Sequence, residues 1–300
     1  MSSPFVFRGA ATALVTPMLP SGEIDEPALR RLVDFQIDNG IDALVPCGTT
    51  GESATLNHAE HHHVMDIVVS QTAGRVPVIV GAGSNSTREA VSLTQHARAI
   101  GADAVLSIAP YYNKPAQEGF IGHYRAIAEA VDIPVIVYNV PGRTGANITA
   151  ETTLRLAEIP GIAGIKEASG SMPQMMEILR AKPERFFVLS GDDALTLPLM
   201  VLGADGVISV AANEVPHHMA RLVKLCLEGK FAEARMLHAE LLPLMNANFI
   251  ESNPIPVKAA LAMMGMITET IRLPLTRLSG DHRFSLRRVL EDLQLTGVTR

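Results

Sequence analysis

Eight short runs of apolar and β-branched residues recur along the chain. Most of them are apolar without alternation, which is typical of strands covered on both faces. Parallel sheets are covered in this way by their crossover helices. We therefore predict eight parallel strands, over residues 11–15, 41–45, 76–80, 102–109, 133–138, 161–166, 186–190 and 205–210.

Segments of helical length with amphipathic spacing separate these runs. Examples are residues 26–40, 58–74, 87–101 and 118–132. Cap residues stand at the ends of such segments: Asp25, Asn57, Ser86 and Thr149 at N-cap positions, and Gly40, Gly74 and Gly101 at C-cap positions. Eight strand–helix units predict a closed α/β (β/α)8 TIM barrel, because eight parallel strands close around a core that side chains can fill. An open doubly wound sheet is the structural alternative.

The pattern becomes helical only after about residue 225. Helices are predicted over residues 228–249, 255–266 and 284–295. We expect residues 1–225 to form the catalytic barrel and residues 226–300 to form a helical C-terminal extension. A barrel of about 250 residues with a modest extension fits the length of 300 residues.

Composition excludes several classes of partner. The formal net charge is −6, and no block of lysines or arginines suggests a nucleic-acid or anionic-membrane surface. No run approaches the roughly 18 apolar residues of a membrane helix, and the first residues do not resemble a signal peptide. The two cysteines, Cys47 and Cys226, lack metal-ligand spacing, as expected in a reducing compartment. We expect a cytoplasmic protein.

Polar residues follow the predicted strands at their carboxyl ends, where barrels carry their catalytic groups. They are Thr16, the loop GTTGE at 48–52, Tyr111 and Tyr112, Tyr138 and Asn139 with Arg143, Lys166 and Glu167, residues 191–193, and Ser209.

Lys166 ends the sixth run, where the apolar period places its side chain inside the barrel. A lysine in an apolar pocket loses stabilisation of its charge, so its pKa falls from about 10.4 and the neutral amine can attack a carbonyl. The alternative is a lysine that reaches the barrel mouth and pairs with Glu167 or another acid. Position alone leaves both open.

Tyr138 ends the neighbouring run. Adjacent strands lie about 4.8 Å apart, so its phenol can reach the Lys166 amine. A tyrosine there can transfer protons during imine formation. Without Lys166 beside it, Tyr138 would be interpreted as an aromatic side chain packing over the barrel.

Two further features are suited to carboxylates. In GTTGE, the glycines allow close approach of the backbone, and successive NH groups form an anion nest. Arg143 stands on a turn in NVPGRTG, and its guanidinium can bind a carboxylate through two hydrogen bonds. The alternatives are an ordinary turn with a helix-capping threonine, and an exposed arginine in a salt bridge. Together with one amine, these features predict a keto acid condensed with another acidic carbonyl compound.

Asp192 and Asp193 follow Gly191 in the seventh loop, where barrels often bind phosphates. Their charges would repel a phosphate, so we expect an unphosphorylated substrate. We interpret both as helix N-caps rather than a metal site.

No metal or dinucleotide is expected. The cluster His58, His61, His62 and His63 lacks a third ligand on one helix face. The stretch GAGSNS at 81–86 departs from the dinucleotide fingerprint at Ser86.

The chain resembles the pyruvate-dependent Schiff-base lyase superfamily, which includes the N-acetylneuraminate lyases, and within it the dihydrodipicolinate synthase family. The motifs are GTTGES (48–53), PYYN (110–113), YNVPGRTG (138–145), GIKEASG (164–170) and LSGDD (189–193), with NPIPVK (253–258) in the extension. The resemblance covers essentially the whole chain. It implies condensation of pyruvate with L-aspartate 4-semialdehyde to a cyclic precursor of lysine and diaminopimelate.

The resemblance also implies roles for single residues. Lys166 forms the imine with pyruvate, so no cofactor is expected, and Thr50 with its neighbouring backbone holds the pyruvate carboxylate. Thr49 links Tyr138 to Tyr112 in a proton relay, in which Tyr112 comes from the neighbouring subunit. The implied assembly is a homotetramer made of two tight dimers.

The second substrate is implied to bind at Arg143, with Gly191 and Ile208 lining the pocket through their backbones. N-acetylneuraminate lyases do not place this arginine in the NVPGRTG context, so it favours the semialdehyde. An aldolase for another 2-keto acid or sugar acid is one alternative. A non-catalytic barrel that binds keto acids or amino acids is the other.

A lysine-inhibitor site is implied as well. In lysine-inhibited members this site lies at the dimer interface, and its residues match Ser53, Ala54, His58, His61, Asn85, Glu89 and Tyr111 here. We therefore expect feedback inhibition by L-lysine, with the histidines as a hydrogen-bonding wall.

Overall fold

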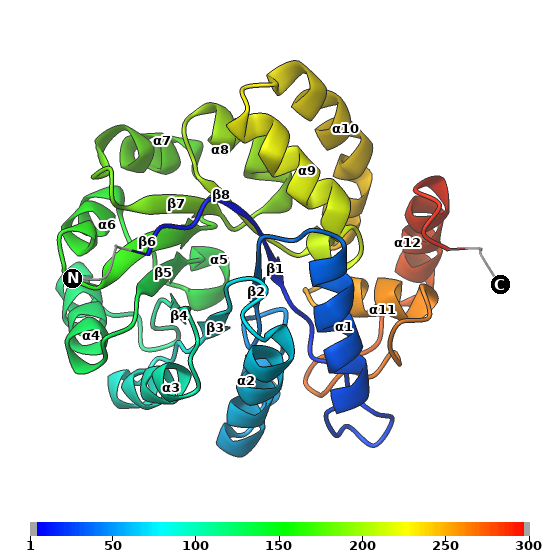
Figure 1. The fold of residues 1–300 in the computed structure, drawn as a ribbon, viewed down its shortest axis with the longest axis horizontal. Coiled ribbons are helices and arrows are strands. Elements are labelled where there is room, and N and C mark those ends of the chain that lie inside the picture. Colours follow the sequence, from blue (N-terminus) through cyan, green and yellow to red (C-terminus); the bar gives the residue numbers. More distant parts are fainter. Residues whose placement is uncertain (1–4, 297–300) are drawn as a thin grey trace.

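The computed structural model describes residues 5–296, and its centre is a barrel of eight parallel strands with helices outside (Figure 1). The strands are β1 (Gly9–Ala13), β2 (Ala43–Val45), β3 (Ile79–Gly81), β4 (Ala104–Ile108), β5 (Val135–Asn139), β6 (Ile162–Glu167), β7 (Phe187–Ser190) and β8 (Gly206–Ser209). They pair in the order β2-β1-β8-β7-β6-β5-β4-β3, and a parallel bridge between Leu44 and Val78 brings the two ends together. The predicted (β/α)8 barrel is confirmed.

Eight helices alternate with the strands. They are α1 (Glu26–Asp38), α2 (His58–Thr72), α3 (Thr87–Ala99), α4 (Gln117–Ala130), α6 (Ala150–Ala157), α7 (Met172–Ala181), α8 (Thr196–Val201) and α9 (Pro216–Leu227). Shorter turns follow four strands on the mouth side: the 3₁₀ helices η1 (Ser53–Thr55), η2 (Asp193–Leu195) and η3 (Ala211–Asn213), and the helix α5 (Pro141–Thr144).

Three of the four predicted N-caps accept the expected hydrogen bond. Asp25 caps α1, Thr149 caps α6, and Asn57 forms a capping box with Glu60 at the start of α2. Ser86 occupies the N-cap of α3, but its side chain makes no cap bond. The Ser86 NH instead donates to Ser84 Oγ, so this end of the helix is arranged by the preceding loop.

Two apolar clusters lie on the two sides of the strands. In β5, Ile136 and Tyr138 point into the barrel, whereas Val135 and Val137 point toward the helices. The strands are therefore apolar on both faces, which explains why their sequences do not alternate.

The C-terminal extension consists of α10 (Phe231–Ala247), α11 (Ile255–Met263) and α12 (Gly280–Asp292) (Figure 1). Helix α10 packs on α9, and α12 packs on both α10 and α11. Helix α9 ends at Leu227, so the last barrel helix crosses the predicted division at residue 225 by two residues. No helix within residues 5–296 is long and apolar enough to cross a membrane.

Candidate active site

Lys166 and Tyr138 are register partners on β6 and β5, and both side chains point into the barrel. Their exposed fractions are 6% and 7%, and Lys166 Nζ lies 4.4 Å from the centre of the Tyr138 ring. Burial lowers the pKa of Lys166 to about 8; the charge of Asp193 opposes this shift and that of Arg143 adds to it. With this pKa roughly a tenth of the amine is neutral at pH 7, far more than for an ordinary lysine, and the neutral form is the one that a nucleophile requires.

Glu167 does not pair with Lys166. Its carboxylate accepts hydrogen bonds from the Asn139 amide at 3.0 Å, from the Ser169 NH at 2.6 Å and from the Gln174 amide at 3.2 Å. Because neighbouring residues of a strand point to opposite faces, Glu167 lies outside the barrel wall while Lys166 lies inside. The interpretation of Lys166 as a surface ammonium paired with Glu167 is wrong.

The Tyr138 phenol lies among groups that could exchange its proton. Burial raises the pKa of Tyr138, whereas the Arg143 charge and a hydrogen bond with the Thr49 side chain lower it. The structure thus brings Thr49, Tyr138 and Lys166 together. Their roles in a relay stay predictions.

The GTTGE loop follows β2, and Gly48, Thr49 and Thr50 line the same cavity as Lys166. Thr50 is 3% exposed, and its Oγ1 accepts a hydrogen bond from Asn253 Nδ2 at 3.0 Å. The Thr16 hydroxyl donates to the Gly51 carbonyl at 2.7 Å. The N-cap of α2 is Asn57, so the alternative in which a loop threonine caps this helix is wrong.

A cavity of about 140 Å³ lies in front of the Lys166 amine. Its lining residues are Ala13, Val45, Gly48, Thr49, Thr50, Leu106, Tyr138, Val140, Arg143, Lys166, Ala168, Gly191, Asp192, Val210, Phe249 and Asn253. A Cβ on Gly191 would lie 2.6 Å from Ala168 Cβ and 3.1 Å from Lys166 Cε, so only glycine leaves the lysine its space. Ile208 is buried in the interior apolar cluster below, and Val210 is the residue of that segment that borders the cavity.

Arg143 lies at the rim of this cavity, on α5. Its side chain is exposed, and its Nη2 donates to the Asn253 carbonyl at 3.3 Å. The rim position suits a group that meets a second, larger substrate. Asn253 therefore contacts both Thr50 and Arg143, and the motif NPIPVK was the sequence signal that could have identified it.

Asp193 is a structural acid near Lys166. Its Oδ2 accepts the NH groups of Val210 and Ala211 at 3.0 and 2.9 Å, and burial raises its pKa. The predicted N-cap role is right for Asp192, which accepts the NH of Ala194, and wrong for Asp193, which holds the segment after β8. Within residues 5–296, no group of three histidine, cysteine or acidic side chains could hold a metal ion.

Tyr112 points away from the cavity of its own chain. It is 87% exposed and has a φ of 68°. It is not among the residues that line the cavity. To take its predicted place in the relay, Tyr112 would have to reach the cavity of another subunit.

A second cavity, of about 530 Å³, adjoins the first. Six of the seven residues predicted for an inhibitor site line it: Ser53, Ala54, His58, His61, Glu89 and Tyr111. Asn85 stands just behind, with its Nδ2 donating to the Tyr111 carbonyl at 3.2 Å. The two cavities share Thr49, Arg143 and Asn253, so a ligand in one adjoins the walls of the other.

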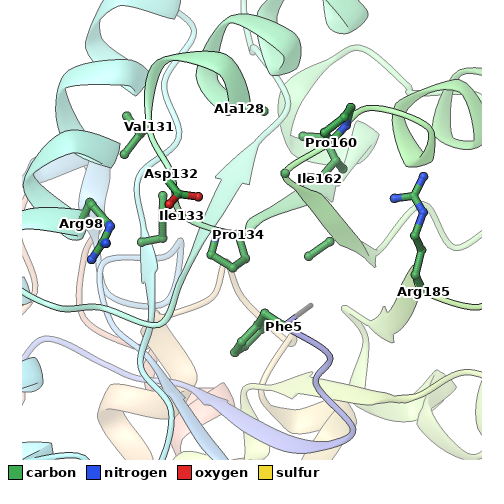
Figure 2. Close-up of a pocket in the computed structure, with 12 residues that line it drawn as sticks. Phe5, Arg98, Ala128, Val131, Asp132, Ile133, Pro134, Pro160, Ile162 and Arg185 are labelled. Carbon is green, nitrogen blue, oxygen red and sulfur yellow. The ribbon is translucent and has the colours of Figure 1, made fainter. Parts of the chain in front are cut away.

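A separate cavity of about 480 Å³ lies at the opposite end of the barrel, before the strands begin (Figure 2). Phe5, Asp132, Pro134, Pro160 and Arg185 are among its lining residues. This cavity is larger than the one at Lys166, but neither a lysine nor any of the predicted site residues lines it. We therefore do not assign the reactive site to it.

Comparisons with known proteins agree on one family. The model of the dihydrodipicolinate synthetase family matches residues 6–293. A 4-hydroxy-tetrahydrodipicolinate synthase from Syntrophus aciditrophicus (strain SB) is 56% identical over 97% of this chain and 100% of that protein. The crystal structure of dihydrodipicolinate synthase from Aquifex aeolicus has a TM-score of 0.95 and 47% identity, covering 98% of this chain and 100% of its own. A DHDPS from Cyanidioschyzon merolae with lysine bound has a TM-score of 0.94 and 44% identity, covering 96% and 99%.

Proposed function

The chain belongs to the dihydrodipicolinate synthetase family, and we propose that it is a 4-hydroxy-tetrahydrodipicolinate synthase that condenses pyruvate with L-aspartate 4-semialdehyde. The observation that carries the proposal is the buried Lys166 amine, whose pKa is lowered to about 8, at the base of a small cavity. The product is a cyclic precursor of lysine and diaminopimelate.

Imine formation begins when neutral Lys166 Nζ attacks the C2 carbonyl of pyruvate. The nitrogen loses a proton and the carbonyl oxygen gains one, which gives a carbinolamine, and loss of water then gives the imine. Tyr138 is the proton carrier, supported by its position against Lys166 and its hydrogen bond with Thr49. Tyr112 of a neighbouring subunit completes the relay.

The imine acts as the electron sink for carbon–carbon bond formation. Once its nitrogen is protonated, the imine draws electrons from C3, so loss of a C3 proton to a base gives a neutral enamine that attacks the aldehyde carbon of the second substrate. Lys166 supplies this activation itself, and the proposed reaction therefore needs no separate cofactor.

Two groups receive the two carboxylates. Thr50 and the backbone NH groups of its loop hold the pyruvate carboxylate beside Lys166. Arg143 at the rim binds the carboxylate of the semialdehyde. Gly191 and Val210 complete the wall of the cavity.

L-Lysine is the proposed ligand of the second cavity. Support comes from the matching side chains that line it and from the lysine-bound relative. Binding there would act on Thr49 and Arg143, which border both cavities. Full activity in millimolar L-lysine would contradict this assignment.

The proposed assembly is a cytoplasmic homotetramer made of two tight dimers. The outward position of Tyr112 supports a subunit contact at this face, because an exposed aromatic side chain gains from burial. Sedimentation velocity would show whether the protein is a monomer, a dimer or a tetramer.

The deciding experiment follows the covalent intermediate and the overall reaction together. Borohydride with pyruvate should trap an adduct on Lys166, and a coupled assay with both substrates should show turnover in the wild type and none in Lys166→Ala. An adduct on another residue would defeat the mechanism. Trapping without turnover of the semialdehyde, but with cleavage of a sugar acid, would select an aldolase instead. Binding of pyruvate without an adduct or turnover would select a non-catalytic barrel.

A further inference from the structure

The loop that carries Thr49 and Thr50 begins and ends in left-handed backbone. Cys47 has a φ of 56° and Glu52 has a φ of 55°. Residues other than glycine hold this conformation only where their surroundings determine it. The loop therefore depends on contacts at its two ends to keep its shape.

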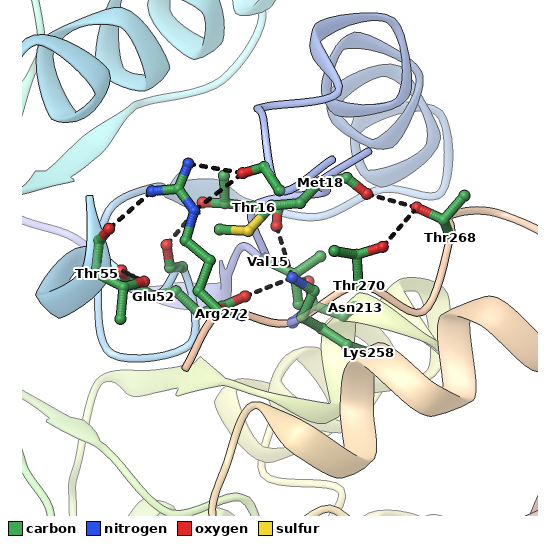
Figure 3. A network of polar contacts seen from close by, with 12 residues as sticks. Val15, Thr16, Met18, Glu52, Thr55, Asn213, Lys258, Thr268, Thr270 and Arg272 are labelled. Atoms are coloured by element: carbon green, nitrogen blue, oxygen red, sulfur yellow. Dashed lines mark hydrogen bonds and ion pairs between the residues drawn. The ribbon is translucent and has the colours of Figure 1, made fainter. Parts of the chain in front are cut away.

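Glu52 is held by a buried ion pair with Lys258 of α11. The side chains of both residues are 1% exposed. Lys258 Nζ also donates to the Thr16 carbonyl at 3.0 Å, and the NH of Arg272 donates to the other Glu52 oxygen at 3.3 Å (Figure 3). Both partners of the carboxylate thus come from the C-terminal extension, more than 200 residues away in sequence.

The same network of hydrogen bonds continues into the loop that carries Thr49 and Thr50. Thr16, whose carbonyl accepts from Lys258, donates through its hydroxyl to the Gly51 carbonyl at 2.7 Å. Asn253, which precedes α11, donates to Thr50 Oγ1. The extension therefore holds this loop at Thr50, at Gly51 through Thr16, and at Glu52.

A buried ion pair contributes little to stability, because loss of hydration offsets the attraction of the charges. Removal of one partner, however, leaves an unpaired charge in the interior, which must move toward water or toward another partner. Without Lys258 the Glu52 carboxylate would keep only the Arg272 NH, so we expect it to shift and to move its own backbone, and Thr50 is only two residues away.

We propose that Lys258 is a positioning residue for pyruvate: by pairing with Glu52 it fixes the loop in the shape that places Thr49 and Thr50 against the substrate bound at Lys166. The C-terminal extension is then part of the catalytic unit. That the ligand is pyruvate rests on the proposed function, whereas the role of Lys258 rests on the contacts between the extension and the loop that carries Thr49 and Thr50.

The test compares Lys258→Met with the wild type by borohydride trapping over a range of pyruvate concentrations. Methionine fills a similar volume without a charge. We expect the pyruvate concentration for half-maximal trapping to rise by about tenfold or more, since small displacements of positioning groups have effects of this size. A purely structural role would lower the midpoint of thermal unfolding without moving this half-saturation.

Lys182→Met is the matched control. Lys182 Nζ pairs with Asp205 at 3.3 Å and donates to the Phe186 carbonyl at 2.8 Å, which repeats the contacts of Lys258 at the opposite end of the barrel. Its removal should lower the unfolding temperature while half-saturation by pyruvate stays within about twofold of the wild type.

A double variant, Glu52→Gln with Lys258→Met, removes both charges and so leaves no unpaired charge in the interior. We expect its half-saturation to lie between those of the wild type and Lys258→Met, about threefold above the wild type. A rise of less than twofold in Lys258→Met, or in the double variant should the single one not fold, would overturn the proposal. Failure of the wild type itself to trap pyruvate would instead overturn the proposed function.

Discussion

At the scale of single residues, the proposed reaction depends on the protonation of Lys166. The barrel interior removes water from the amine, and the nearest compensating charge, that of Asp193, only opposes the resulting shift of its pKa. Asp193 is in turn bound by the NH groups of Val210 and Ala211, so its carboxylate is partly neutralised before it acts on the lysine.

Imine formation should therefore accelerate with pH in a defined window. Because only the neutral amine attacks pyruvate and the Lys166 pKa is about 8, the rate should rise from pH 6 and level off above about 9. The measurement is the initial rate of borohydride trapping at a fixed pyruvate concentration. A rate that is flat from pH 6 to 9 would show that deprotonation of Lys166 does not limit the step.

Glu214 predicts a second pH dependence, on stability. Its side chain is buried; burial raises its pKa well above the ordinary value, and Asp193 adds to the shift. Asn248 Nδ2 donates to Oε2 at 3.0 Å, but Oε1 and the Asn248 Oδ1 have no partner in the described part of the chain. A proton on Glu214 would supply a donor next to these acceptors, so the folded protein favours the acid form.

The folded state therefore holds a proton that the unfolded chain releases above about pH 4.3. The free energy of unfolding should fall as pH rises from there toward the folded pKa, by up to about 1.4 kcal/mol per pH unit from this group. Glu214→Gln keeps an acceptor and a permanent donor, so it should exceed the wild type in stability by an amount that grows from pH 5 to 8. Denaturant unfolding at each pH measures this. The exposed Glu184→Gln is the control, and an equal dependence in all three proteins would refute the argument.

At the scale of elements, the sequence is informative where one local rule decides the structure. Runs such as residues 133–138 are apolar because both faces of β5 are buried, so the pattern predicts strand, burial and parallel pairing together. Pairing of successive strands then places Tyr138 opposite Lys166. These parts of the site could be predicted because they depend only on strand period and strand order.

Contacts between distant segments could not be predicted in this way. Asp193 stands at a position typical of an N-cap, but its distant partners Val210 and Ala211 decide what it does. Asn253 and Lys258 belong to the helical extension, and no periodicity in the sequence shows that they reach the GTTGE loop. Only the resemblance carried by NPIPVK indicated their segment.

The two predicted caps Asn57 and Ser86 allow this distinction to be measured. Asn57→Ala removes the side-chain oxygen that accepts the Glu60 NH at the start of α2, so it should lower the free energy of unfolding by about 1 kcal/mol. Ser86→Ala removes a side chain that makes no cap bond, so its effect should stay within about 0.5 kcal/mol. Equal losses in denaturant unfolding would mean that residue type at the N-cap, and not the bond seen in the structure, sets the stability.

At the scale of the whole molecule, the residues that stabilise the barrel differ from those that are proposed to react. The interior and outer apolar clusters hold the strands. The groups proposed to react lie at the carboxyl ends of the strands and in the turns that follow, and Asn253 of the extension borders the same cavity. One predicted catalytic group, Tyr112, does not join them within its own chain. If Tyr112 takes part in the reaction, it must do so in the site of another subunit, and activity then depends on assembly.

Mixed dimers can show whether Tyr112 acts across a subunit contact. Lys166→Ala subunits keep Tyr112, and Tyr112→Phe subunits keep Lys166, so each homo-oligomer should be strongly impaired in the coupled assay. If Tyr112 acts across a subunit contact, a mixed dimer purified through two different tags contains one complete site, with Lys166 from one subunit and Tyr112 from the other. Its activity should then return to about half that of the wild type. If Tyr112 acts within its own chain, both sites of the mixed dimer lack a residue, and the activity should be no higher than the mean of the two parents.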